Sequence, residues 1–137
     1  MSDEKFIAVD LNLPCHDTEL KDAETAIANL RLKLATIYAS DSLDDAQHLH
    51  YYEEIMRILD YIGRLSMFTS SIRSELEQLY LAKFKSSPEL AKQIWLDHYE
   101  KLHHPYNILK NRCFRMLDDL DVAYHFKFKK YPPNWKA

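Results

Sequence analysis

Glycine is almost absent from this chain of 137 residues, which contains only Gly63. Phosphate-binding loops, nucleophile elbows and dinucleotide-binding turns need glycine where the backbone adopts positive φ or approaches a ligand closely. Sheet proteins with many tight turns also depend on it. The shortage of glycine therefore argues against most nucleotide-binding and hydrolase folds, and against a β-sheet architecture.

Other features are missing as well. The two cysteines, Cys15 and Cys113, lack the spacing of a CxxC motif, and no apolar run approaches the roughly 20 residues that span a bilayer. The acidic N-terminal stretch has neither the basic nor the long apolar segment of a secretory signal. We therefore expect a cytoplasmic protein with reduced thiols, no membrane contact and one globular domain.

The segment 42–85 contains no proline, and its apolar residues recur at steps of three and four, as on one face of a helix. The sequence predicts a single helix over 42–85, roughly 65 Å long at 1.5 Å per residue, around which the other helices pack. The alternative is a break at Ser70-Ser71, where hydroxyl groups compete for backbone hydrogen bonds.

Three further helices are expected. In residues 17–39 apolar side chains alternate at steps of three and four, which is typical of a helix–helix seam. Ser87-Pro88 predicts the start of a helix over 88–103, and Pro105 predicts a new start for a helix over 105–130. A strand is the alternative near Phe126–Lys130, because polar and apolar residues alternate there.

The predicted fold is thus an all-α bundle of four main helices, or five if 42–85 breaks, around one long central helix. Residues 1–16 form an extended arm with enough apolar content to dock on the helices, and residues 131–137 form a tail.

A metal site can be proposed from four residues, His50 and Glu54 in the segment 42–85 and Glu100 and His103 in the segment 88–103. The second pair has the Glu-x-x-His spacing of di-iron bundles, but such bundles need two of these motifs and two further glutamates. We therefore predict no metal, no cofactor and no catalytic residues.

Two further groups are interpreted as structural. Cys113 lies on an apolar stripe, as expected of a buried inert thiol. The acidic triplet Asp118, Asp119 and Asp121 is predicted to form a solvated helix face.

Charge is distributed unevenly along the chain. Residues 1–54 carry 4 basic and 12 acidic side chains, a net −8, whereas residues 55–137 carry 14 basic and 9 acidic side chains, a net +5. The end of the chain mixes cations with aromatics, which suits a protein partner, and the predicted contact residues are Lys127, Lys129, Lys130, Tyr131 and Trp135. Folding back as a cap on the bundle is one alternative. Nucleic-acid binding is another, although the net charge of −3 disfavours it.

The predicted helix over 42–85 is too long for its neighbours to cover, so part of its apolar stripe should be exposed. Tyr52, Met56, Met67 and Phe68 are the candidates for this exposed part. Antiparallel coiled-coil pairing with a second copy would bury them, which predicts a homodimer.

Taken together, these patterns predict a non-enzymatic interaction protein: an adaptor, a regulator or a small subunit of a larger assembly. A nucleic-acid accessory protein that uses the basic tail is one alternative, and a metal-binding helical bundle is the other.

Overall fold

The structure is a computed structural model that describes residues 16–133, apart from the side chains of residue 68, residues 70–73 and residue 76. It contains four helices, which are α1 (Asp17–Ala39), α2 (Asp45–Leu65), α3 (Met67–Lys83) and α4 (Pro88–Phe128), and the described range has no strand. The predicted all-α class is confirmed. The predicted arm lies largely outside the described residues.

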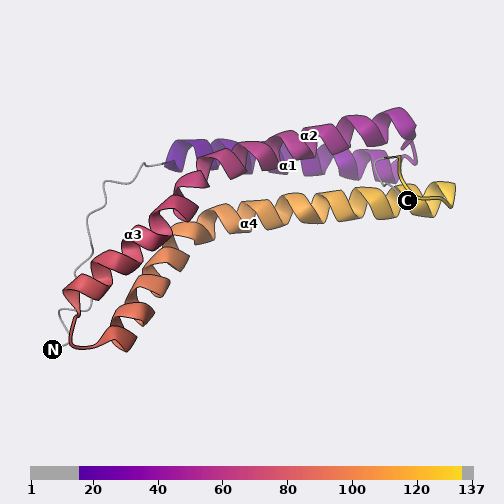
Figure 1. Cartoon of the computed structure of the whole chain (residues 1–137). Helices are drawn as coiled ribbons and strands as arrows, with labels where there is room; N and C mark the ends of the chain where they lie inside the picture. The colour runs from indigo at the N-terminus through magenta and orange to yellow at the C-terminus, as the bar shows by residue number, and fades with distance from the viewer. Residues whose placement is uncertain (1–15, 134–137) are drawn as a thin grey trace.

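The central helix is α4, which packs against each of the other three. The hairpin of α1 and α2 lies along the C-terminal half of α4, and α3 lies along its N-terminal half (Figure 1). We call these parts the three-helix section and the two-helix section. The prediction that the segment 42–85 is central was wrong, because α4 alone extends through both sections.

The predicted helix over 42–85 is in fact two helices, which meet at Ser66. The Ser66 hydroxyl donates a hydrogen bond to the carbonyl of Gly63 (3.1 Å), and the Thr69 hydroxyl donates to the carbonyl of Ser66 (2.7 Å). Hydroxyl groups thus compete for helix carbonyls, as the alternative of a broken helix predicted. The break itself is at Ser66, four residues before Ser70. At the other end, α2 is capped by the Asp44 carboxylate, which accepts from the N–H of Gln47 (2.7 Å).

The predicted boundary at Pro105 is absent, because α4 continues through this proline. A proline inside a helix lacks the N–H that would bond the carbonyl four residues earlier, and its ring bends the helix. Figure 1 shows α4 bent between its two halves. Buried residues on the same stripe, including Trp95 before the proline and Tyr106 after it, offset the cost of the lost bond.

The start of α4 matches its sequence signal, whereas its end comes two residues before the predicted end at residue 130. The helix begins after Ser87 with Pro88 in its first turn, as predicted. It ends at Phe128, where Lys129 adopts a left-handed conformation with φ 58°. The helical interpretation of residues 125–128 is correct, and the strand alternative is wrong.

The break at Ser66 and the bend at Pro105 lie next to each other, at the same height along the packed helices α3 and α4. His103 Nδ1 lies 3.0 Å from the Thr69 hydroxyl oxygen, and His16 Nδ1 lies 2.8 Å from the hydroxyl of Tyr106. Because the Thr69 proton is donated to Ser66, its oxygen accepts from His103. We call this junction, formed by Ser66, Thr69, His103 and Pro105, the elbow.

Replacing Thr69 with valine should destabilise the protein by about 1–3 kcal/mol, because it removes both hydrogen bonds that the buried hydroxyl makes, to the carbonyl of Ser66 and with His103. Urea unfolding followed by circular dichroism measures this change. The matched control is Thr36→Val, where an exposed hydroxyl bonds the carbonyl of Leu32 within α1. Equal midpoints for the two variants would show that the elbow bond contributes nothing.

Candidate functional site

The four metal candidates do not converge. His50 and Glu54 lie near the start of α2, where Glu54 accepts a hydrogen bond from Arg57 (3.0 Å). The start of α2 is next to residue 121 of α4, since His48 Nε2 lies 2.9 Å from the Asp121 carboxylate. Glu100 and His103 come earlier on α4, roughly 27 to 32 Å from residue 121 along the helix axis. Within residues 16–133 no three His, Cys, Asp or Glu side chains gather as a metal site requires.

A buried polar cluster joins α2 to α4 in the three-helix section. His48, only 1% exposed, contacts the carboxylate of Asp121 and packs edge-on against Tyr124 at 4.9 Å between ring centroids. The Tyr124 hydroxyl donates to the Asp45 carboxylate, and this bond, followed by burial, raises the pKa of Tyr124 to about 12. These groups hold the helices together.

The cluster corrects part of the sequence interpretation. Asp118 and Asp119 are exposed, as expected of a solvated face, but Asp121 turns inward toward His48. His48 lies on the same stripe of α2 as Tyr52 and Ile55. A polar residue at such a core position was the sequence signal that could have identified this cluster.

Cys113 is fully buried, and burial raises the pKa of its thiol to about 11. A thiol that is protonated and inaccessible at neutral pH is a poor nucleophile.

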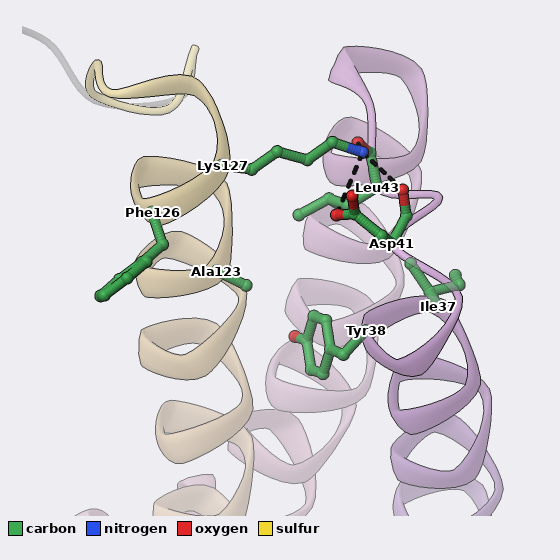
Figure 2. Close-up of a pocket in the computed structure, with 7 residues that line it drawn as sticks. All are labelled: Ile37, Tyr38, Asp41, Leu43, Ala123, Phe126 and Lys127. Carbon is green, nitrogen blue, oxygen red and sulfur yellow. Dashed lines mark hydrogen bonds and ion pairs between the residues drawn. The ribbon is translucent and has the colours of Figure 1, made fainter.

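The strongest candidate for a binding site is at the C-terminal end of α4. A pocket of about 350 Å³ lies between the end of α1 and the end of α4; we call it the C-terminal pocket. It is lined by Ile37, Tyr38, Asp41, Leu43, Ala123, Phe126 and Lys127 (Figure 2).

Lys127 reaches across from α4 to the turn between α1 and α2 (Figure 2). Its ammonium group donates to the carbonyls of Asp41 and Leu43, at 2.7 Å each, and lies 3.5 Å from the Asp41 carboxylate. Lys127 was predicted to contact a partner, but here it holds two walls of the pocket together.

The Tyr38 hydroxyl is buried beside this pocket and has no hydrogen-bond partner within the described part of the chain. Figure 2 shows the ring between the helices, with the hydroxyl directed toward α4. Burial, together with the nearby charges of Asp119 and Asp121, raises the pKa of Tyr38 to about 12. The phenol therefore stays protonated and is an unused hydrogen-bond donor.

The rim next to the pocket is basic and aromatic. Phe126 is 72% exposed and points away from α1, and Tyr131 is 67% exposed and stacks on His125 at 5.5 Å. The ammonium of Lys129 lies 5.0 Å from the centre of the Phe126 ring, and Lys130 is exposed. We call Phe126, Lys129, Lys130 and Tyr131 the aromatic rim. Trp135 lies outside the described residues.

The residues predicted for self-association differ in their exposure. Tyr52 is half-buried and stacks on His48, with 6.4 Å between ring centroids, so it belongs to the core. Met56 and Met67 are exposed, the first on α2 and the second at the start of α3. The side chain of residue 68 is not described.

No protein-family model, curated protein or solved structure matches this chain. Among residues 16–133, no helix is both long enough and apolar enough to cross a bilayer.

Stability should fall on mild acidification because of two histidines near α3. Burial lowers the pKa of His98, with a smaller effect of Lys101, and burial followed by Lys110 lowers the pKa of His103. The unfolded chain then takes up these protons first, near the ordinary histidine pKa of about 6.5. The free energy of unfolding should therefore decrease as pH falls through 6.5 toward the lowered folded pKa values.

Urea unfolding between pH 7.5 and 5.5 tests this prediction through the slope of stability against pH. The double variant His98→Gln/His103→Gln should show a smaller slope than the parent. His50→Gln, at an exposed position of α2, is the control for removing a histidine. An identical slope in the parent and the double variant would contradict the assignment.

Proposed function

We propose that this protein is a non-enzymatic interaction protein that binds an acidic segment of a protein partner at the C-terminal pocket and aromatic rim. The observation that carries the proposal is the exposure of Phe126, which lines the C-terminal pocket, and of Tyr131, which follows the end of α4. Large aromatic side chains that remain in solvent next to a concave surface are frequent anchors of protein interfaces.

The chemistry of the surface favours an acidic partner. Residues 124–133 contain three lysines and no acidic side chain. Lys127 is occupied within the chain, so Lys129 and Lys130 on the aromatic rim supply the charge that attracts the partner.

Several groups suited to acid–base chemistry are used in contacts between helices, which supports a binding role over a catalytic one. His48 is paired with Asp121, Tyr124 with Asp45, and His103 with Thr69.

Nucleic acid is an alternative partner for the same surface, because aromatic and basic side chains also suit stacking on bases. Two observations count against nucleic acid, which carries a phosphate at every nucleotide and needs an extended basic surface. The chain has a net charge of −3, and Lys127, one of the basic residues of this region, binds backbone carbonyls of the chain itself.

Phe126→Ala and Lys129→Glu test the proposal by affinity capture from an extract of the native source, with quantitative mass spectrometry. Partners held by the parent should be retained roughly tenfold less by either variant, because each removes an interface anchor or a steering charge. Thermal unfolding should be unchanged for Phe126→Ala, since this side chain is exposed.

Leu32→Ala is the matched control, an exposed apolar residue on α1 in the same three-helix section. Proteins retained by the parent and by Leu32→Ala, but lost from both rim variants, are the predicted partners. Identical profiles for all four chains would contradict the proposal, and a labelled single-stranded oligonucleotide that binds the parent and not Lys129→Glu would favour the alternative.

A further inference from the structure

The face of α4 that points away from α1 and α2 carries exposed apolar side chains in the three-helix section. Val122 is 60% exposed, and Phe126, about one turn further along the helix, is 72% exposed. Leu120 and Tyr124 are fully buried on the opposite side of α4, since a step of two residues turns a helix by about 200°. Among the described residues, the hairpin of α1 and α2 therefore leaves Val122 and Phe126 largely uncovered.

These two side chains belong to a longer seam on the same face. Asp119, Val122, Phe126 and Lys129 follow one another at steps of three, four and three residues, which is the spacing of a coiled-coil seam. Asp119 and Lys129 are exposed as well. We call these four residues the outer seam. It begins with an acid, continues with two apolar residues and ends with a base about 15 Å from the acid.

We propose that the partner bound at the aromatic rim is a second copy of this chain, whose outer seam packs antiparallel against the first. This inference rests on the proposed function, because Phe126 and Lys129 belong to the aromatic rim, and it identifies the acidic segment of the partner as the helical turn around Asp119. The two-fold axis passes between Val122 and Phe126. Val122 of each copy then packs against Phe126 of the other, and each Asp119 faces Lys129 of the other copy.

The order of charges along the outer seam is the reason for choosing a second copy. A two-fold interface needs one surface that is complementary to itself, and a seam that runs from acid through two apolar residues to base meets this requirement when it is reversed. The Lys129 ammonium lies 5.0 Å from the centre of the Phe126 ring. A cation beside a ring keeps its charge, so this contact holds the base next to the apolar part of the seam.

The proposed pairing covers the same apolar side chains that the hairpin leaves exposed. Each copy contributes one valine and one phenylalanine to the centre of the interface, and one acid and one base to its ends. An interface of this size belongs to the small, transient class. The dimer should therefore form at high protein concentration and dissociate on dilution. The pairing also assigns self-association to α4 instead of the segment 42–85.

Sedimentation equilibrium at tens to hundreds of micromolar measures the proposed association. The parent should approach twice the chain mass of 16.3 kDa at the highest concentrations. Val122→Glu should keep the mass of one chain, with unchanged helix content by circular dichroism, because the substituted side chain is exposed. Leu32→Glu, at an exposed leucine of α1, is the control and should associate like the parent. A parent that stays monomeric, or equal dissociation by both glutamate variants, would overturn the proposal.

A mixing experiment tests the antiparallel register and the identity of the partner together. Asp119→Lys and Lys129→Glu should each raise the dimer dissociation constant about five- to tenfold, because each places like charges opposite one another twice in the dimer. An equal mixture of the two variants should associate within about twofold of the parent, because every lysine then faces an acid of the other chain. A mixture that associates no better than either variant alone would rule out this register.

The second copy and the proposed function can fail separately. A monomeric parent, combined with proteins captured by the parent and lost from Lys129→Glu, would overturn the second copy as partner while supporting the proposed function. A monomeric parent with identical capture profiles for the parent and Lys129→Glu would overturn both. A parent that dimerises and loses its dimer in Val122→Glu, together with recovery in the mixture, is the result that the proposal predicts.

Discussion

The elbow is the constraint on which the shape of the molecule depends. One hydroxyl group, that of Thr69, donates to the carbonyl at the break between α2 and α3 and accepts from His103 near the bend of α4. Because break and bend lie at the same level, α3 stays against α4 when the chain changes direction. A break without a bend, or a bend without a break, would separate the two helices and expose the faces that they share.

The elbow divides the described part of the chain into the three-helix section and the two-helix section. In the three-helix section a large apolar core is reinforced by His48–Asp121 and Tyr124–Asp45, and Lys127 connects α4 to the turn after α1. This rigid end can present the C-terminal pocket and the aromatic rim in a fixed arrangement. Among the described side chains of the two-helix section, Tyr80, Ala91 and Trp95 form the buried cluster between α3 and α4.

The sequence was most informative where hydrophobic spacing alone decides the structure. The seam of residues 17–39 is buried almost throughout in α1, and Ser87-Pro88 marks the start of α4. It was misleading at Ser66 and Pro105, where local propensity and tertiary packing compete. A proline usually ends a helix, but α4 continues because apolar residues on both sides of Pro105 are buried on one stripe.

Long-range polar contacts could not be predicted, because the position of one residue in the sequence does not indicate which distant residue it contacts. His48 and Asp121 are 73 residues apart, and Lys127 bonds carbonyls more than 80 residues earlier. The contacts of Lys127 could not be predicted for the same reason. Lys129, Lys130 and Tyr131 are exposed, whereas Lys127 is used within the chain.

The central claim is that the Thr69 hydroxyl links the break between α2 and α3 to the bend of α4 through His103, and a double-mutant cycle in urea unfolding tests it most directly. Thr69→Val and His103→Ala should each lower the free energy of unfolding, and the double variant should lose less than the sum of the two losses, with a coupling energy of about 0.5–3 kcal/mol. Strictly additive losses would contradict the account.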